Sequence, residues 1–257
     1  MPSHKRAPFV SLLTLLRRRF PDLDEPARLI GEGVVLVDGV PAANPRTLVR
    51  ADAAIRIQRP RPLRGTIKLA HALRAFDVNP AGMVALDLGA AAGGFTQALL
   101  DAGAARVYAV DAGAGQLRAS LRVNPKVTNL ERTNLARLGR DLIPERPEIV
   151  TMDLSYLAVA AAIGQIDHRL LAPGAQLIAL IKPTFELRAA TLADHPQQVR
   201  TAVQAATCAL AAHCWQVLGE EPSPILGSKG AVEVFLHARS CLAASSVRPE
   251  GGRVRED

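Results

Sequence analysis

Two charged side chains stand where the sequence predicts that apolar strands end, and two more lie on other predicted elements. Asp153 and Lys182 each follow an apolar run, Glu233 is the one charge inside the apolar run 231–236, and Lys68 lies on a helix expected before the first strand. A neutral lysine amine can accept a proton from a hydroxyl, a nearby cation favours that neutral form, and carboxylates hold the amines in place. The group therefore predicts activation of a hydroxyl for attack. For each residue alone, a salt bridge or a surface charge is the alternative.

A glycine-rich turn follows the apolar strand 84–88 and leads into a helix. Such a turn lets the backbone approach a ligand closely and directs helix N–H groups toward it. Its spacing fits neither the dinucleotide pattern Gly-x-Gly-x-x-Gly nor the phosphate-binding pattern Gly-x-x-x-x-Gly-Lys-Ser/Thr. It is similar to the Asp-x-Gly-x-x-x-Gly loop of S-adenosylmethionine-dependent methyltransferases, where the acid faces the positive end of the cofactor. The candidate cofactor-binding residues of this segment are Asp87, Gly89, Ala90, Ala91, Gly93, Gly94 and Phe95.

Asp111 supports the same interpretation of the turn. It ends the next apolar strand, 22 residues beyond Gly89. A carboxylate at this place can accept hydrogen bonds from both hydroxyls of a ribose. The alternatives are a plain tight turn for the glycines and a helix cap for Asp111.

Helices and apolar strands alternate from residue 66 onward, which predicts a Rossmann-like, doubly wound and mostly parallel sheet in the α/β class. Such a sheet would bring the carboxyl ends of its strands to one ligand-binding edge. The last two strands are expected to form an antiparallel hairpin. The expected strands are 84–88, 106–111, 149–153, 175–182, 217–218 and 232–237, and the expected helices are 66–76, 95–101, 115–122, 157–171 and 199–214.

The first sixty residues show a different pattern, that of a small α+β module. Helices are expected at 9–19 and 24–30, and a hairpin is expected around Asp38-Gly39, a pair that fits a tight two-residue turn. A further strand is expected at 54–58. We therefore divide the chain into a small module (1–59), a Pro-rich linker (60–65), a larger domain (66–242) and a disordered tail (243–257). The charge and the motifs described next lead us to expect RNA binding by the small module and methyl transfer by the larger domain.

The net positive charge lies in the first quarter of the chain. Residues 1–68 contain 13 basic and 6 acidic side chains, whereas residues 69–257 contain 18 of each. A polyanion such as nucleic acid would meet a basic arm on a neutral body. A solvated basic surface without a partner is the alternative. The candidate RNA-binding residues are Arg17, Arg18, Arg28 and Arg64.

The remaining composition excludes several classes of protein. The three cysteines, at positions 208, 214 and 241, cannot form a disulfide framework, and we expect them to be small core residues. No apolar run reaches the length of a membrane-spanning helix, and the basic N-terminus lacks the core of a signal peptide. We therefore expect a cytoplasmic protein with reduced thiols, no membrane partner and no metal site. The oligomeric state stays open.

Seven ordered motifs together resemble the TlyA (haemolysin A) family of ribosomal RNA 2′-O-methyltransferases, whose catalytic domain is of the FtsJ type. The resemblance covers roughly residues 5–240, and the four charged residues named first are all present. Departures occur at residues 7–12, where an Arg-Leu-Asp motif is expected, and at 187–188 and 230–231. These changes favour a shifted RNA target over a loss of activity. The matching motifs are 63–73, 87–96, 110–117, 131–134, 152–155, 181–186 and 227–233.

The resemblance implies roles for individual residues. Lys68, Asp153, Lys182 and Glu233 match the catalytic tetrad, in which Lys182 activates the ribose 2′-hydroxyl. The glycine-rich turn and Asp111 would bind S-adenosylmethionine, and Asn134 joins them as a candidate cofactor contact. The expected substrate is ribosomal RNA, as a ribosomal subunit or as free RNA, with cytidine as the modified nucleoside.

Two other functions stay open from the residues alone. The first is a non-catalytic RNA- or ribosome-binding protein that retains the methyltransferase fold, although a binding protein has no need for a mixed-charge group at the strand ends. The second is methylation of a protein, a small molecule or a base. Base amino methylation often uses an Asn/Asp-Pro-Pro-Tyr motif, whereas residues 153–156 are Asp-Leu-Ser-Tyr and contain no proline.

Overall fold

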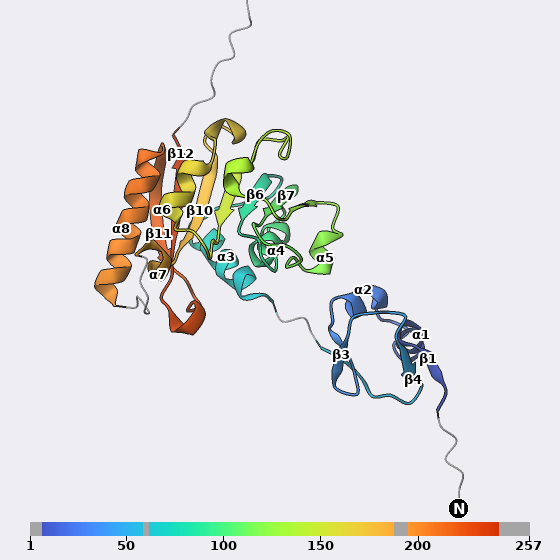
Figure 1. The fold of residues 1–257 in the computed structure, drawn as a ribbon. Coiled ribbons are helices and arrows are strands. Elements are labelled where there is room, and N and C mark those ends of the chain that lie inside the picture. The colour runs from blue at the N-terminus through green and yellow to red at the C-terminus, as the bar shows by residue number, and fades with distance from the viewer. Residues whose placement is uncertain (1–6, 59–61, 188–194, 242–257) are drawn as a thin grey trace, which may run out of the picture.

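A seven-stranded sheet is the centre of the computed structural model, which describes residues 7–58, 62–187 and 195–241 (Figure 1). The strand order is β11-β12-β10-β9-β6-β7-β8. Neighbouring strands from β10 to β8 pair in parallel, and β12 pairs antiparallel with both β10 and β11. This order confirms the predicted α/β class and the antiparallel hairpin at the end. The strands are β6 (Val84–Leu88), β7 (Arg106–Val110), β8 (Val127–Leu130), β9 (Ile149–Met152), β10 (Gln176–Ile181), β11 (Trp215–Pro222) and β12 (Val234–Ser240).

Helices cover both faces of this sheet. In β10, Ile178 and Leu180 join an apolar cluster with α3 and α4, while Leu177 and Ile181 join a second cluster with α6 and α8. Alternate residues of a strand point to opposite faces, so a strand that is covered on both faces is mostly apolar along its whole length. Figure 1 shows α8 running along the β11–β12 end of the sheet. The helices are α3 (Arg64–Ala75), α4 (Gly94–Asp101), α5 (Ala119–Arg122), α6 (Val159–Ala162), α7 (Pro183–Glu186) and α8 (Pro196–Ala212).

The N-terminal residues form a separate small core. The hairpin of β2 and β3 turns at Asp38 and Gly39, which both have positive φ, as predicted for a tight Asp-Gly turn. The strands pair in the order β3-β2-β5, and β1 pairs with β4. The elements are β1 (Phe9–Ser11), α1 (Leu12–Arg19), α2 (Pro26–Gly31), β2 (Val35–Val37), β3 (Val40–Ala42), β4 (Leu48–Arg50) and β5 (Ile55–Ile57).

The predicted division into domains stays a prediction. The first two residues of the linker expected at 60–65 lie outside the described residues, and so does the whole tail expected at 243–257. Helix α3 begins at Arg64, inside that expected linker.

Several expected elements differ in the structure. The helix expected at 9–19 begins only at Leu12, because Ser11 caps it and the preceding residues pair with β4. The helix expected at 157–171 is broken into α6 and two 3₁₀ turns, the second of which is capped by Asp167, whose side chain accepts the N–H of Arg169. The helix expected at 115–122 is reduced to α5, and β4 and β8 were not predicted.

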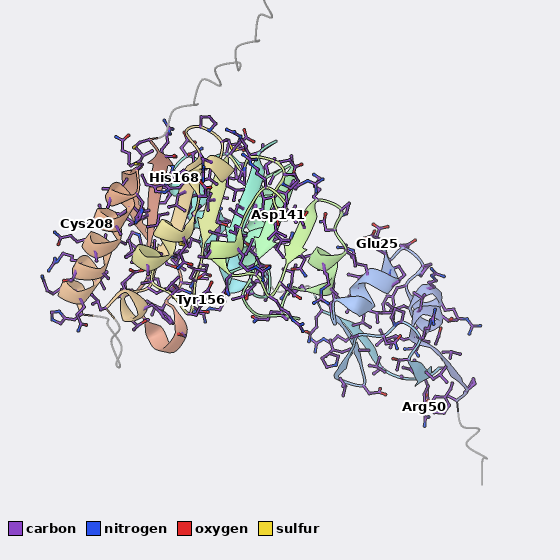
Figure 2. The ribbon with its side chains drawn as sticks, turned by 45° about the horizontal axis from the view of Figure 1, so that its top comes forward. Glu25, Arg50, Asp141, Tyr156, His168 and Cys208 are labelled. Carbon is purple, nitrogen blue, oxygen red and sulfur yellow. The ribbon has the colours of Figure 1, made fainter. Side chains whose placement is uncertain are left out.

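The expectation that the cysteines are core residues is wrong, because all three are exposed. Cys208 lies on the outer face of α8, whose buried residues are Ala202, Ala206 and Leu210 (Figure 2). Cys214 follows the end of that helix. Among the described residues, no helix combines the length and the apolar character needed to cross a bilayer.

Candidate active site

The register of the sheet brings three of the predicted catalytic residues to one edge. Asp153 follows β9 and Lys182 follows β10, and these two strands are parallel neighbours. Glu233 precedes β12, which runs antiparallel to β10 and pairs Val234 with Ile181. Lys182 and Glu233 are therefore adjacent in the register. They lie at the carboxyl edge of the parallel strands, the edge at which open α/β sheets bind ligands.

Three groups contact the ammonium of Lys182. Its Nζ lies 2.6 Å from Oδ1 of Asp153, an ion pair by distance that lacks the angle of a hydrogen bond. The same Nζ donates a hydrogen bond to Leu154 O at 3.0 Å, and it lies 5.9 Å from the centroid of the Phe185 ring. The side chains of Lys182 and Asp153 remain 15% and 24% exposed. A substrate oxygen can therefore reach the amine.

The second lysine, Lys68, forms an ion pair with Glu233 in the interior. Their side chains are only 8% and 6% exposed, so this pair is more enclosed than Lys182 and Asp153. Gly227 makes room for the carboxylate, because a Cβ at that position would overlap Glu233 Oε1. The four predicted catalytic residues thus form two ion pairs, one exposed in part and one buried.

A cavity of about 340 Å³ opens beside the Lys182–Asp153 pair. Its volume is in the range of small-molecule binding sites. Five of the predicted cofactor-binding residues line it, together with both members of the exposed pair. A second cavity, of about 500 Å³, lies between α3 and α4 and contains none of the predicted site residues. The first cavity is lined by Leu63, Arg64, Gly65, Gly89, Ala90, Ala91, Ala92, Gly94, Phe95, Asp153, Ser155 and Lys182.

Two glycines permit close approaches that shape this cavity. Gly89 has a φ of +87°, and a Cβ added there would lie 2.6 Å from Asp153 O. Gly94 begins α4, and a Cβ there would lie 2.8 Å from the Cα of Gly65. Helix α3 can therefore begin directly against α4, an arrangement that the hydrogen bond from Thr66 Oγ1 to Gly94 O at 2.9 Å also supports.

Asp87 does not face the cavity, contrary to the expectation from the loop pattern. The residue is fully buried beneath the turn, where its carboxylate accepts hydrogen bonds from the hydroxyls of Thr96 at 2.6 Å and Thr151 at 2.8 Å. Burial raises the pKa of Asp87 to about 6, against the opposing effect of the two hydroxyl donors and with a further increase from the charge of Asp153. The carboxylate of Asp87 in β6 is therefore hydrogen-bonded to α4 and to β9 beneath the turn.

We expect the Asp87→Asn variant to lose a component of the pH dependence of stability. A raised folded-state pKa means that the stability contribution of Asp87 is present below the ordinary pKa of 3.8 and is lost as the pH rises through about 6. The difference in free energy of unfolding between the variant and the unaltered chain should therefore shift by about 1 kcal/mol in favour of the variant as the pH rises from 5 to 7. Urea unfolding at both pH values measures this difference. An identical pH slope in the two proteins would contradict the prediction.

Asp111 braces the loops around the cavity and does not line it. Its Oδ2 accepts the N–H of Ala91 at 2.8 Å, and its Oδ1 accepts the N–H of Gly113 at 2.7 Å. Gly93 and Asn134, the other predicted cofactor contacts outside the cavity lining, lie at the N-terminus of α4 and before the 3₁₀ turn Leu135–Arg137. The sequence pattern predicted Asp111 at the end of a strand, where it lies directly after β7, but gave no indication of its hydrogen bonds to backbone amides.

The four predicted RNA-binding arginines differ in their surroundings. Arg17 and Arg18 are exposed at the end of α1, and no hydrogen bond or ion pair joins their side chains to another described residue. Arg28 forms ion pairs with Glu25 at 2.5 Å and Glu32 at 3.2 Å. Arg64, in contrast, lines the cavity. Its guanidinium donates hydrogen bonds to the backbone carbonyls of residues 226 and 227, so it has a structural role that the sequence did not predict.

Four further residues line the cavity that were not predicted from the sequence. Gly65 and Ser155 lie within the motifs 63–73 and 152–155. A glycine directly before a predicted helix, as at Gly65, could have indicated the close crossing of two helices. Tyr156, labelled in Figure 2, follows Ser155 and is 51% exposed. Leu63 and Ala92 carry no chemical signal in the sequence and are found only through the fold.

Comparisons with known proteins give a family match over most of the described residues. The model of the FtsJ-like methyltransferase family matches residues 62–240. The "16S/23S rRNA (cytidine-2'-O)-methyltransferase TlyA" of Mycobacterium tuberculosis is 38% identical over 84% of this chain and 84% of its own length. The "23S rRNA (cytidine-2'-O)-methyltransferase TlyA" of Campylobacter jejuni is 29% identical over 68% of this chain and 69% of its own.

The solved structures include a protein of similar fold and length. This protein of Streptococcus thermophilus, provisionally named a hemolysin, superposes with a TM-score of 0.67 and 26% identity. The alignment covers 91% of this chain and 89% of that one, so the likeness extends beyond the segment matched by the family model.

Proposed function

The chain belongs to the FtsJ-like methyltransferase family, and from this premise we propose that it methylates the 2′-hydroxyl of a cytidine ribose in ribosomal RNA. The methyl donor of this enzyme class is S-adenosylmethionine. The observation that carries the proposal is the Lys182–Asp153 pair in the wall of the cavity formed by the glycine-rich turn. The names of the relatives from M. tuberculosis and C. jejuni support cytidine and ribosomal RNA as the substrate.

The residues of the cavity fit a bound cofactor. The positive φ of Gly89 and the close crossing at Gly94 keep the turn free of side chains that would fill the space. Ala90 and Ala91 add only methyl groups to the wall. These residues would hold S-adenosylmethionine, which supplies an electrophilic methyl group on its sulfonium. Asp111 would act through the loops that it braces, by fixing the amide of Ala91.

In this proposal Lys182 moves the proton. Its neutral amine would accept the proton of the 2′-hydroxyl, which would leave the ribose oxygen free to attack the electrophilic methyl group that the bound cofactor would supply. The proton remains on Lys182, where Asp153 and Leu154 O stabilise the ammonium. The buried pair of Lys68 and Glu233 keeps α3 and the start of β12 in place beside the reacting groups. Alignment of the two substrates supplies most of the remaining reduction of the barrier.

Labelled methyl transfer tests the proposal directly. Purified small and large ribosomal subunits that lack the modification are incubated with the chain and methyl-labelled S-adenosylmethionine, and the RNA is digested to nucleosides. The expected product is 2′-O-methylcytidine. A methylated base would point to the base-modifying alternative, and cofactor binding without any transfer would favour the non-catalytic RNA-binding protein. Action on ribosomal RNA would also support the predicted cytoplasmic location.

Replacing Asp111 with alanine should weaken cofactor binding. The variant loses the two hydrogen bonds that a charged group makes to the amides of Ala91 and Gly113. Loss of such bonds corresponds to roughly 1–3 kcal/mol. Calorimetry with S-adenosylhomocysteine measures the change, and Asp111→Asn should fall between the two proteins because it retains one acceptor oxygen. An unchanged dissociation constant would show that Asp111 is only a local cap.

Replacing Arg17 and Arg18 together with alanine should weaken RNA binding and reduce its dependence on salt. Each phosphate contact that is lost lowers the slope of log K against log salt by about 0.7–0.9. Filter binding of ribosomal RNA at several salt concentrations measures the slope. Arg169, exposed and paired with Asp167, provides the control, and Arg169→Ala should leave the slope unchanged. Equal slopes for the double variant and this control would show that the two arginines of α1 do not contact RNA.

A further inference from the structure

Glu186, the last residue of α7, makes contacts that the proposed reaction does not use. Its side chain is half-buried, and its Oε1 accepts the N–H of Val159 at 2.6 Å. Its Oε2 lies 3.4 Å from the N–H of Ala160. Both amides belong to the first turn of α6, so the carboxylate joins two short helices that are far apart in the sequence (Figure 1).

Each of these helices is joined directly to one member of the Lys182–Asp153 pair. The carbonyl of Lys182 accepts the N–H groups of Phe185 at 2.9 Å and Glu186 at 3.1 Å, so the backbone of Lys182 is part of the first turn of α7. Residues 153–158 lead without interruption from Asp153 to α6. Within that segment, Leu154 supplies the carbonyl that accepts the hydrogen bond from Lys182 Nζ.

Both helices pack against α8, but each depends on contacts outside itself to fix its position. Each has four residues, which is too short to be stable without outside contacts. Helix α6 begins after Ala158, whose side chain has no acceptor, so its first amides lack a local cap. The carboxylate of Glu186 supplies that cap from the neighbouring element.

The burial of Glu186 is costly, and no cation in the described part of the chain compensates for it. Burial raises the pKa of this carboxyl, although the amides of Val159 and Ala160 act in the opposite direction. No ion pair joins Glu186 to a cationic side chain within residues 7–58, 62–187 and 195–241. The hydrogen bonds of its side chain in this part of the chain are those with the first two amides of α6.

We propose that Glu186 is a positioning residue, which fixes α7 against α6 and thereby holds the amine of Lys182 at its place beside Asp153. This inference rests on the proposed function, because it concerns the pair that would accept the proton. Glu186 itself does not line the cavity and is not expected to contact the cofactor or the RNA.

Kinetics of methyl transfer by Glu186→Ala and Glu186→Gln test the inference. We expect the alanine variant to lose about 10- to 100-fold in kcat, because misplacement of a reacting group costs that much, with less than a twofold change in KM for RNA and in the dissociation constant of the cofactor. The glutamine variant should recover part of kcat, since its amide oxygen can still accept the N–H of Val159. If Glu186 acted only through packing, the difference in side-chain volume between the two variants would change stability and KM together with kcat. A recovery by glutamine that is confined to kcat would therefore indicate the hydrogen bond.

Glu148 offers a matched control. Its Oε2 accepts the N–H of Val84 at 3.1 Å, and it lies at the opposite edge of the sheet, where β6 and β9 begin. Glu148→Gln therefore alters the same kind of bond away from the candidate site and should leave kcat unchanged. Amide hydrogen exchange, followed by mass spectrometry on the unliganded chain, should show faster exchange at residues 159–160 in Glu186→Ala and not in Glu148→Gln.

The outcomes separate the inference from the proposed function. If the unaltered chain transfers no methyl group to ribosomal RNA, the proposed function fails, and the positioning role fails with it. If the unaltered chain is active and both Glu186 variants retain the kcat of Glu148→Gln, only the inference is overturned. A loss confined to KM, or unchanged exchange at residues 159–160, would also overturn it. Should the alanine variant not fold, the glutamine variant decides by the same measurements.

Discussion

Replacing Lys182 with alanine should reduce methyl transfer to ribosomal RNA by about a thousandfold, within the range expected for removal of a group that accepts a proton. Among the described residues no other lysine lines the cavity, and the side chain of Lys68 is paired with Glu233 and only 8% exposed. Cofactor affinity should change little, since the glycine-rich turn is intact in this variant. Single-turnover rates and calorimetry measure the two quantities separately.

Lys182→Arg is the informative companion to this variant. An arginine keeps the positive charge and the ion pair with Asp153, but its guanidinium does not lose a proton in proteins. If Lys182 accepts the proton, the arginine variant should be nearly as inactive as the alanine variant. If charge alone is required, the arginine variant should retain most of the rate. Full turnover by the alanine variant would remove Lys182 from the mechanism.

Gly89→Ala should disrupt both the fold around the turn and cofactor binding. Its φ of +87° is unfavourable for alanine, and the new Cβ would lie 2.6 Å from Asp153 O, a backbone atom that cannot move aside cheaply. Strain and overpacking together should lower the free energy of unfolding by about 2–4 kcal/mol. Shifting Asp153 would also displace the partner of Lys182. Chemical unfolding and calorimetry with S-adenosylhomocysteine measure the two effects.

Gly82→Ala separates strain from crowding. Gly82 also has a positive φ, +76°, but a Cβ there would meet nothing within 4 Å. This variant should show the cost of the backbone conformation alone and keep its cofactor affinity. If Gly82→Ala and Gly89→Ala are equally destabilised and both bind cofactor normally, the close approach of Gly89 to Asp153 is unimportant.

The sequence predicted the central sheet well because its strands are covered on both faces. Strands β6, β7, β9 and β10 are mostly apolar, and a short apolar run is visible without knowledge of its partners. Strand β8 was missed, since all four of its residues are only partly buried and two of them are polar. The prediction of one helix at 157–171 was wrong. The apolar residues of this segment face the core from irregular turns, so their spacing along the chain follows no single helical period.

The candidate site was predictable in its members but not in its pairing. Charged residues at strand ends identified Asp153 and Lys182, since parallel strands end at a common edge. Which lysine pairs with which carboxylate depends on the register of β12 and on the close crossing of α3 with α4, and neither can be inferred from spacing along the chain. The same holds for Arg64, whose guanidinium binds carbonyls 162 and 163 residues away.

The antiparallel strand β12 has a consequence for how the protein is made. Because β12 lies between β11 and β10, its insertion both covers the open edge of β10 and delivers Glu233 to Lys68. A nascent chain that has emerged only as far as α8 would carry an uncovered strand edge and a buried lysine without its counter-ion. The finished arrangement can therefore form only after translation has passed the last strand, and a product that stops short of it should be both inactive and prone to aggregate.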